Sequence, residues 1–188
     1  MSMSMMWIVI GVIAVAVLWY IAIYNRLRRM KVFIQEAWSG IDVQLKRKAN
    51  ILPNLVDTLK MQMNFEQDVL TKLTEARAGL TGSDRAAAMK ANDEVTKLLP
   101  SINAVAEAYP ELGTNKSFLQ MMGDIRDCED KVAYARNRYN MAVSRYNMEI
   151  VSIPSNFVAG MMGLSAEQMF EIPNEARTDA DNMRIGKL

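Results

Sequence analysis

The sequence contains no histidine and only one cysteine among its 188 residues. The absence of histidine removes the commonest general base and the commonest zinc ligand. Because Cys128 stands alone, it has no partner for an internal disulfide. Cysteine usage therefore does not distinguish an oxidising from a reducing compartment. Positive and negative charges are also nearly balanced, with 22 basic and 21 acidic residues. This balance gives no electrostatic support to nucleic-acid binding. We therefore expect no cofactor, no metal centre and no nucleic-acid partner.

Charge is also lacking over the whole stretch from Met5 to Tyr24, which reads MMWIVIGVIAVAVLWYIAIY. A helix of this length reaches about 30 Å, the thickness of the hydrocarbon core of a bilayer. Trp7 lies at one end, and Trp19, Tyr20 and Tyr24 lie at the other, as in the aromatic belts of membrane proteins. A cleaved signal peptide is the alternative, but it would need a basic start and a shorter apolar stretch. We expect a retained membrane anchor.

The flanks of this span predict its orientation. Arg26, Arg28, Arg29 and Lys31 follow the span at once, whereas no charged side chain precedes it. The positive-inside rule then places the N-terminus outside and the large C-terminal domain in the cytoplasm of a single-pass cell-membrane protein. Alternatively, these residues contact anionic lipid head groups, which is compatible with the same orientation. The bilayer is thus the first expected partner.

Beyond the span, the hydrophobic period is helical throughout, and no strand-like alternation occurs. The first amphipathic segment has no proline or glycine between it and the span, so we expect one continuous helix, with Pro53 as a kink or restart. A further helix should run from about Asp84, after a cap at Ser83, to Ala108, with a kink at Pro100. The apolar residues of the first segment recur at three- and four-residue steps: Leu27, Met30, Ile34, Trp38, Ile41, Leu45 and Leu52.

The longest helix should begin after a cap at Thr114 or Asn115 and end before Pro154. Its apolar residues repeat at nearly 3.5 residues, the spacing of a coiled-coil or bundle core. They are Phe118, Met122, Ile125, Cys128, Val132, Ala135, Tyr139, Ala142 and Tyr146. The predicted fold class is all-α: one N-terminal transmembrane helix continues into an antiparallel bundle of three to four long helices.

These patterns predict four segments. Residues 1–4 form a short N-terminal segment, and residues 5–24 form the transmembrane helix. Residues 25–164 form the helical domain, which ends in a short apolar stretch, residues 157–164, that could contact lipid, the domain or a neighbouring subunit. Residues 165–188 are polar and predict a mobile tail.

Several blocks, in order, resemble the LemA family of bacterial membrane proteins, over about Tyr24 to Phe170. They are AWSGIDVQLKRKANILPNLV at Ala37–Val56, EARAGL at Glu75–Leu80, AEAYPEL at Ala106–Leu112, RNRYNMAVSRYN at Arg136–Asn147 and IPSNFVAG at Ile153–Gly160. The resemblance implies a membrane-anchored helical-bundle domain without established catalytic residues. It also implies, from the genes that accompany family members, a partner such as a membrane metallopeptidase.

Two positions depart from the family pattern. Many members have a histidine before the glutamate of the second helix, whereas this chain has Phe65 before Glu66. A proton-transfer step through a histidine at this position is therefore excluded in this chain. Pro100 interrupts a helix that is continuous in the family.

Four charged residues lie beside or within the apolar positions of the predicted helices: Asp42, Glu66, Arg77 and Arg136. Because buried charges need partners, we expect a carboxylate–guanidinium network between helices that fixes their register.

The triplet Arg-Tyr-Asn occurs twice with a spacing of seven, which places Tyr139 and Tyr146 on one helix face with Asn140 and Asn147 beside them. One interpretation is that the tyrosines fill the helix interface and their hydroxyls find a partner at its edge. The other, with Phe157 added, is a surface for self-association or for a partner.

Two charged clusters have an ordinary and a functional interpretation. Lys46, Arg47 and Lys48 predict a solvated face, or a contact to lipid or to another subunit. The acidic residues Asp124, Asp127, Glu129 and Asp130 predict a solvated face that answers Arg126 and Lys131, with a metal site as the alternative.

Three functions are compatible with the sequence. The leading one is a non-enzymatic, membrane-anchored scaffold that assembles into a homo-oligomer. The second is an adaptor or regulator of another membrane protein, such as a metallopeptidase or sensor. The third is a metal-dependent hydrolase, but neither a nucleophile nor a ligand set accompanies the carboxylates.

Overall fold

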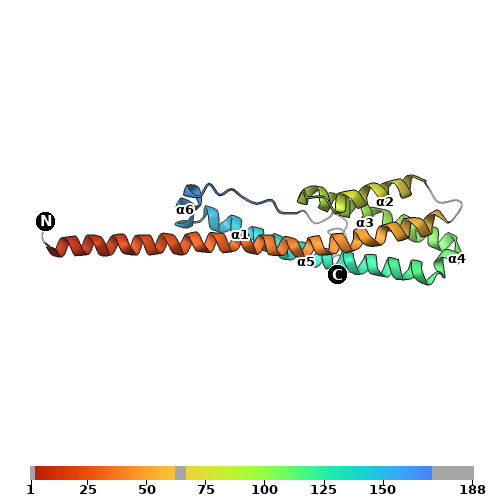
Figure 1. Cartoon of the computed structure of the whole chain (residues 1–188), viewed down its shortest axis with the longest axis horizontal. Coiled ribbons are helices and arrows are strands. Elements are labelled where there is room, and N and C mark those ends of the chain that lie inside the picture. The colour runs from red at the N-terminus through yellow and green to blue at the C-terminus, as the bar shows by residue number, and fades with distance from the viewer. Residues whose placement is uncertain (1–2, 62–66, 171–188) are drawn as a thin grey trace, which may run out of the picture. The chain divides into compact units, whose positions relative to one another are not determined.

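The structure is a computed structural model that describes residues 3–61 and 67–170. Its elements, drawn in Figure 1, are α1 (Met3–Lys60), α2 (Gln67–Leu80), α3 (Arg85–Ala108), α4 (Pro110–Gly113), α5 (Lys116–Val151) and α6 (Ser155–Met161). Within these described ranges no strand occurs. The all-α prediction is therefore confirmed, together with the long apolar helix at the N-terminus.

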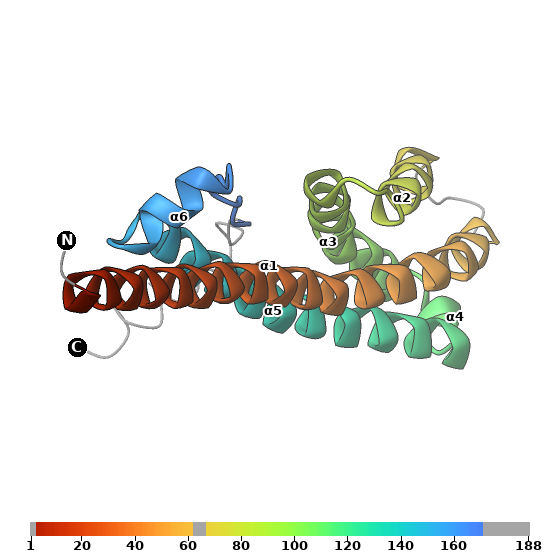
Figure 2. The same cartoon turned by 60° about the vertical axis from the view of Figure 1, so that its left-hand side comes forward.

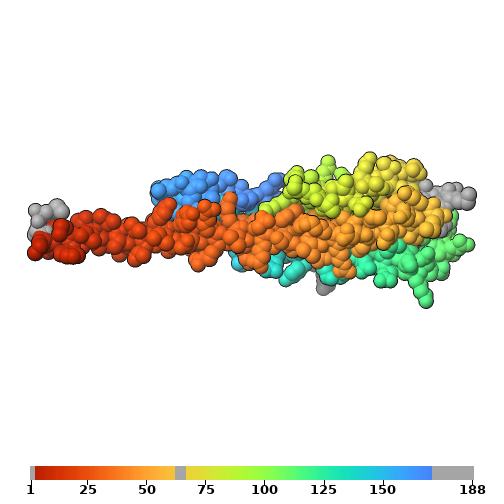
Figure 3. All heavy atoms as spheres, viewed as in Figure 1, coloured from red at the N-terminus to blue at the C-terminus, as the bar shows by residue number. Residues whose placement is uncertain are grey.

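Helix α1 continues without interruption for 58 residues and passes through Pro53. The prediction of a restart at Pro53 is therefore wrong. The first part of α1 is long and apolar enough to cross a membrane, and only 6% of its most apolar window is buried. On the face shown in Figure 3, this red part of α1 is uncovered until the blue segment that contains α6. These apolar side chains thus lack a protein core of their own.

Contact clustering divides the chain into two compact units. Of the described residues, the first unit contains 3–38 and 137–169, and the second contains 39–61, 67–136 and 170. Helices α1 and α5 therefore contribute to both units, and each unit has its own core.

In the first unit, α1 and α5 run antiparallel, because rising numbers on α1 meet falling numbers on α5. Trp38 and Tyr139 make an edge-to-face contact with ring centroids 6.2 Å apart. Helix α6 packs on α1 at the end of the apolar span, where a buried cluster joins the two helices (Figures 1 and 2). The residues of this cluster are Ile23, Leu27, Val158 and Ala159.

In the second unit, α2 contacts α3 and α3 contacts α4, while polar side chains join α1 to α3 and to α5. The predicted apolar positions of α5 in this unit are buried, from Phe118 to Val132. Gly79 on α2 approaches α3 so closely that a Cβ atom there would lie 2.7 Å from the Cβ of Ala91. A small residue at position 79 is therefore required for this helix contact.

The helix ends are capped by short polar side chains. Asp84, rather than the expected Ser83, caps α3, and its carboxylate accepts a hydrogen bond from the Ala86 amide at 3.1 Å. At α5, Oδ1 of Asn115 accepts from the amides of Ser117 and Phe118 at 2.9 and 3.2 Å, as predicted. These acceptors satisfy first-turn amides that have no partner within the helix.

Candidate interaction sites

The residues expected to anchor the chain lie at the two ends of the apolar span, Trp7 at its start and the others at its end. Trp7 and Trp19 are exposed, whereas Tyr20 and Tyr24 are half-buried against the cluster beneath α6. Nε of Arg28 donates a hydrogen bond to the Tyr24 hydroxyl at 3.2 Å, and its guanidinium lies 5.4 Å from the centre of that ring. Aromatic and basic residues are thus coupled at the expected membrane boundary.

Two of the predicted basic anchor residues also hold the first unit together. Arg26 forms an ion pair with Glu149 on α5 at 2.8 Å, and Lys31 forms one with Glu167 at 3.3 Å. Arg28 and Arg29 are exposed, so they present charge to the surroundings of the helix. The basic cluster therefore combines an internal and an external role.

The Arg-Tyr-Asn repeat contacts the chain's own C-terminal segment. We define the C-terminal strap as residues 164–169, which follow a turn at Gly163 with a φ of 62°. Tyr139 and Tyr146 are buried, and their hydroxyls donate to the backbone carbonyls of Gln168 and Ser165 at 3.3 and 3.1 Å. The two tyrosines thus satisfy the first of the two interpretations drawn from the sequence.

Asn147 fastens the strap by pairing with the backbone of one residue. Its amide Nδ2 donates to the Glu167 carbonyl at 2.8 Å, and its Oδ1 accepts from the Glu167 amide at 2.9 Å. Lys31 lies 5.7 Å above the Tyr146 ring and ion-pairs with the Glu167 carboxylate. The first residues of the predicted mobile tail, 165–168, are therefore held on α5, and the rest of that tail from residue 171 lies outside the described residues.

Burial raises the pKa of the Tyr146 phenol, and the nearby Lys31 ammonium partly offsets that rise. The phenol therefore remains a hydrogen-bond donor at neutral pH. Of the other residues expected to form a recognition surface, Asn140 is half-buried and Phe157 is 66% exposed. Phe157 is thus the member of that set that faces away from the protein.

A buried polar cluster lies in the second unit around Lys48, which is fully buried. Its ammonium group contacts the Glu129 carboxylate and donates to Oδ1 of Asn92 at 2.9 Å. The Thr96 hydroxyl donates to the same carboxylate at 2.7 Å. The prediction of a solvated face is wrong for Lys48, because its position continues the apolar stripe of α1. Burial lowers the pKa of Lys48, and Glu129 counteracts part of that effect.

The expected network of four charged residues is arranged differently. Arg136 does form a guanidinium–carboxylate pair between helices, but its partner is Asp93 on α3, at 2.7 Å. Asp42 pairs with Lys46 on its own helix at 2.6 Å, and Arg77 is exposed on α2. Glu66 lies outside the described residues. The described members of the expected set therefore do not join one another through the ion pairs found here.

The acidic face of α5 is largely engaged by basic residues. Arg47 on α1 bridges Asp124 and Asp127 at 2.9 and 2.7 Å, and Lys131 contacts Asp127 at 2.8 Å. The hydrogen bond from Lys131, with Arg47 in addition, lowers the pKa of Asp127. Arg126 instead donates to Asn103 at 3.1 Å. Among the described residues, no group of three or more metal-ligating side chains of the histidine, cysteine or carboxylate type occurs.

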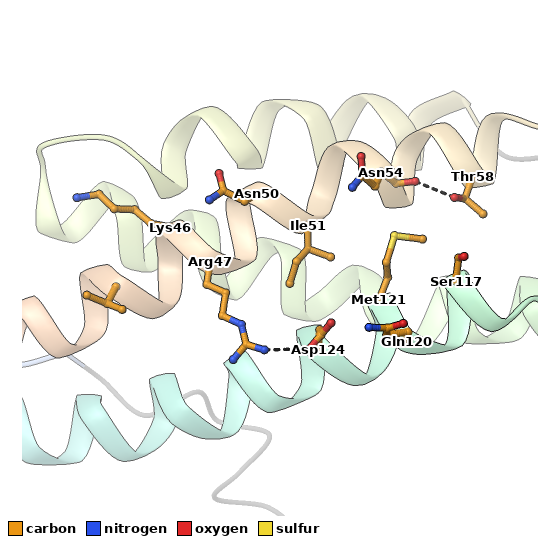
Figure 4. A pocket seen from close by; sticks show the side chains of 11 residues that line it. Lys46, Arg47, Asn50, Ile51, Asn54, Thr58, Ser117, Gln120, Met121 and Asp124 are labelled. Atoms are coloured by element: carbon orange, nitrogen blue, oxygen red, sulfur yellow. Dashed lines mark hydrogen bonds and ion pairs between the residues drawn. The ribbon is translucent and has the colours of Figure 1, made fainter.

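An open surface groove lies between α1 and α5 in the second unit, with a volume of about 720 Å³. We call it the α1–α5 groove. In Figure 4, Arg47 reaches across one end to Asp124, while Ile51 and Met121 extend from the two helices into the space between them. Its lining residues are Val43, Lys46, Arg47, Asn50, Ile51, Asn54, Thr58, Ser117, Gln120, Met121 and Asp124. The lining thus combines amide, hydroxyl and charged groups with apolar side chains.

The apolar helix at the N-terminus and the all-helical remainder define a class of helical proteins with one candidate membrane anchor. The sequence model of the LemA family matches residues 37–183. The chain belongs to the LemA family.

The chain is similar to a protein LemA and to magnetosome proteins. Protein LemA of Metamycoplasma hominis is 28% identical over 168 residues, which cover 88% of this chain and 77% of that protein. Magnetosome protein MamQ 2 of Paramagnetospirillum magneticum is 26% identical over 176 residues, covering 79% of this chain and 64% of that protein. Magnetosome protein MamQ of Magnetospirillum gryphiswaldense is 23% identical, with 78% and 64% covered. The matched part therefore spans less than two thirds of the magnetosome proteins.

Proposed function

We propose that this protein is a membrane-anchored, non-enzymatic helical scaffold that assembles into a homo-oligomer. The observation that carries the proposal is the continuity of α1. One helix of 58 residues begins as an exposed apolar span and ends inside a packed helical unit. No loop separates the span from the domain, because both belong to one continuous helix.

We further propose that the helical part is an antiparallel bundle whose long members are α1, α2, α3 and α5. The antiparallel contacts of α1 with α5 in the first unit and the contact of α2 with α3 in the second support this arrangement. The non-enzymatic character is supported by the pairing of the charged side chains. Lys48 pairs with Glu129 and Arg136 pairs with Asp93, and none of these four residues lines the groove. Arg47 and Asp124 do line the groove, but they form an ion pair with each other.

The α1–α5 groove is the surface that we propose for self-association. Val43, which lines it, is 60% exposed, and Ile51 and Met121 add apolar area. Asn50, Asn54 and other polar lining residues can satisfy the polar groups of an incoming helix. The groove thus offers both apolar contact area and hydrogen-bonding groups, the two components of a helix-binding surface.

The native mass of the full-length protein in mild detergent tests this proposal. We expect the unsubstituted chain to have a mass of several subunits, with detergent accounted for. The substitution Val43→Glu should shift the mass toward the monomer, because a charge would be buried in the interface. Tyr134→Glu is the matched control, since Tyr134 is an exposed apolar residue of α5 at 73% exposure and does not line the groove. A monomeric unsubstituted chain at all concentrations would contradict self-assembly.

A second candidate function follows from the same groove: an adaptor for another membrane protein, such as a metallopeptidase or sensor. The mixed polar and apolar lining is the specific observation, because it can receive a foreign helix as well as a second copy. A photo-reactive amino acid at position 43 distinguishes the two occupants in native membranes. Crosslinks to a second copy support the scaffold, and a stoichiometric crosslink to a different protein supports the adaptor.

The basic flank supports a cytoplasmic position for the helical domain, with the N-terminus outside the cell membrane. Arg28 and Arg29 are exposed just after the apolar span, where the positive-inside rule counts them. Their charge is available to anionic lipid head groups as well.

A further inference from the structure

The turn from α5 to α6 is unusually poor in charge for a surface segment. No charged side chain occurs from Ile150 to Ala166, although 23% of the residues of the chain are charged. We call residues 150–166 the uncharged corner. Its first two residues end α5, and its one complete helix, α6, covers Ser155–Met161, which at 7 residues is too short to cross a bilayer. The composition therefore requires an apolar environment that the corner does not provide for itself.

One side of the uncharged corner is packed and the other is exposed. Val158 and Ala159 are buried against α1, with Met162 and Leu164 partly buried beside them. The remaining large apolar side chains project from the protein. They are Val151 at 72%, Ile153 at 79%, Phe157 at 66% and Met161 at 76% exposure. Several large apolar side chains exposed on one short segment are uncommon on a soluble surface and mark a contact.

The position of the uncharged corner on α1 identifies that contact. Val158 and Ala159 pack on Ile23 and Leu27, and Tyr20 and Tyr24 line the same cluster. The apolar span ends at Tyr24. From Ile23 to Leu27 the helix rises about 6 Å. The head-group region on each side of a bilayer is about 5–8 Å thick, so this rise fits within it. Helix α6 is therefore level with the interface that the end of the span occupies (Figures 1 and 2).

We propose that the uncharged corner is a second membrane contact, which inserts Ile153, Phe157 and Met161 into the interface of the leaflet that α1 leaves. This inference rests on the proposed anchoring of α1 in a membrane. The bilayer is favoured over a second copy because the corner is fixed at the depth of the aromatic belt. Apolar side chains at that depth gain stability by entering the lipid, whether or not the protein associates.

A second contact point changes what the anchor can do. A single helix can tilt and rotate in the bilayer, whereas a helix with a second membrane contact beside it has a preferred tilt and rotation. Arg26 and Glu149 form an ion pair in the same region, at 2.8 Å, which ties α5 to α1 directly behind the corner. The corner would thus set the angle at which α1 leaves the membrane.

Spin labelling of the full-length chain in vesicles of phosphatidylcholine and phosphatidylglycerol tests this proposal. Phe157→Cys carries the label at the corner, and Ile153→Cys provides a second position there. Ile13→Cys, at a 57% exposed residue of the span, is the lipid reference. Tyr134→Cys is the water reference, because Tyr134 is exposed and lies about 25 Å before Val151 along α5. Labelling of the unsubstituted chain reports any reaction at buried Cys128.

Collisions of each label with oxygen, which partitions into lipid, and with a neutral nickel chelate, which stays in water, give the result. We expect labels at positions 157 and 153 to favour oxygen over nickel, as at position 13, and the label at position 134 to show the reverse order. A corner label that behaves like position 134 overturns the inference while the anchor stands. Weak collision with both reagents would place the corner in a protein contact and overturn it as well. If position 13 itself favours nickel, the anchoring and this inference both fail.

Discussion

At the residue scale, Tyr146 on α5 contacts both the C-terminal strap and α1. Its hydroxyl donates to the Ser165 carbonyl at 3.1 Å, and its ring lies beneath the Lys31 ammonium. Tyr146→Phe keeps the ring but removes the donor, so the free energy of unfolding should fall by about 0.5–1.5 kcal/mol. Urea unfolding of the full chain in detergent measures this change. Tyr134→Phe is the control, because Tyr134 is exposed and its hydroxyl can remain in water; an equal effect of both substitutions would contradict the strap contact.

Lys48 gives a second prediction, from the cost of an unpaired buried charge. Lys48→Met removes the partner of Glu129, whose side chain is 19% exposed. We expect the free energy of unfolding to fall by about 3 kcal/mol, the lower end for a broken buried pair, because some water reaches Glu129. The double substitution Lys48→Met with Glu129→Gln should recover much of this loss. Equal stability of the single variant and the unsubstituted protein would mean that the pair is not buried in solution.

The same lysine predicts a pH dependence of known sign. Burial lowers the folded-state pKa of Lys48 below its unfolded value. The stability contribution of this group is therefore complete above the unfolded pKa and is lost as the pH falls through the folded pKa. The free energy of unfolding of the unsubstituted protein, relative to Lys48→Met, should rise as the pH increases from 7 toward the ordinary lysine pKa. Parallel urea titrations of both proteins measure the difference, and a falling difference would contradict the burial of the ammonium.

The spacing of Lys48 in the sequence indicates that it is buried, although its residue type suggests an exposed position. Lys48 continues the three- and four-residue steps from Ile41 and Leu45 to Leu52, so it belongs to the apolar stripe of α1. Its neighbours Lys46 and Arg47 are rotated away from that stripe. Asp93, in contrast, has no such signal as the partner of Arg136, because the pairing depends on how α3 and α5 meet in space.

At the element scale, glycines in two helices should respond to alanine in opposite ways. Gly79→Ala places a Cβ atom 2.7 Å from the Cβ of Ala91 and forces α2 from α3, so stability should fall by about 1–3 kcal/mol. Gly123→Ala on α5 meets nothing within 4 Å and should raise stability by about 0.5–1 kcal/mol through helix propensity. Thermal unfolding of both variants measures the two shifts. A gain for Gly79→Ala would contradict the close approach of α2 and α3.

The period of the hydrophobic residues predicted the helices well and their connections poorly. Periodicity reports which side of a helix is buried, so the burial of α5 from Phe118 to Val132 followed from spacing alone. Pro53 misled the prediction because a proline within a long helix is tolerated when packing on both sides holds the helix. The strap had little signal, since Asn147, Tyr139 and Tyr146 bind its backbone carbonyl and amide groups, which every residue type carries.

At the scale of the whole molecule, the sequence alone predicted the order of anchor, basic flank and helical domain. Local composition dictates each of these. The α1–α5 groove could not be predicted, because its lining residues come from segments that are distant in sequence, such as Asn50 and Gln120. The position of the uncharged corner beside the end of the span also depends on the packing of α6 on Ile23 and Leu27.

Orientation in the membrane is a property of the whole chain, and it yields the last prediction. Arg28 and Arg29 are exposed after the span, whereas Arg26 and Lys31 are used in ion pairs. The pair of substitutions Arg28→Gln and Arg29→Gln therefore removes flanking charge and leaves the ion pairs of the fold intact. Each positive charge near the end of a span favours its retention in the cytoplasm. We expect a larger fraction of chains with the helical domain outside.

A C-terminal alkaline phosphatase fusion, which is active only outside the cytoplasm, measures that fraction. Its activity should be low for the unsubstituted chain and should rise for the doubly substituted one. Lys90→Gln with Lys97→Gln is the control of equal charge change, because both lysines are exposed on α3, far along the chain from the span. The positive-inside rule counts charges within about 15–20 residues of a span, so the control should stay low. High activity of the unsubstituted fusion would reverse the proposed orientation, and it would place the uncharged corner in the outer leaflet.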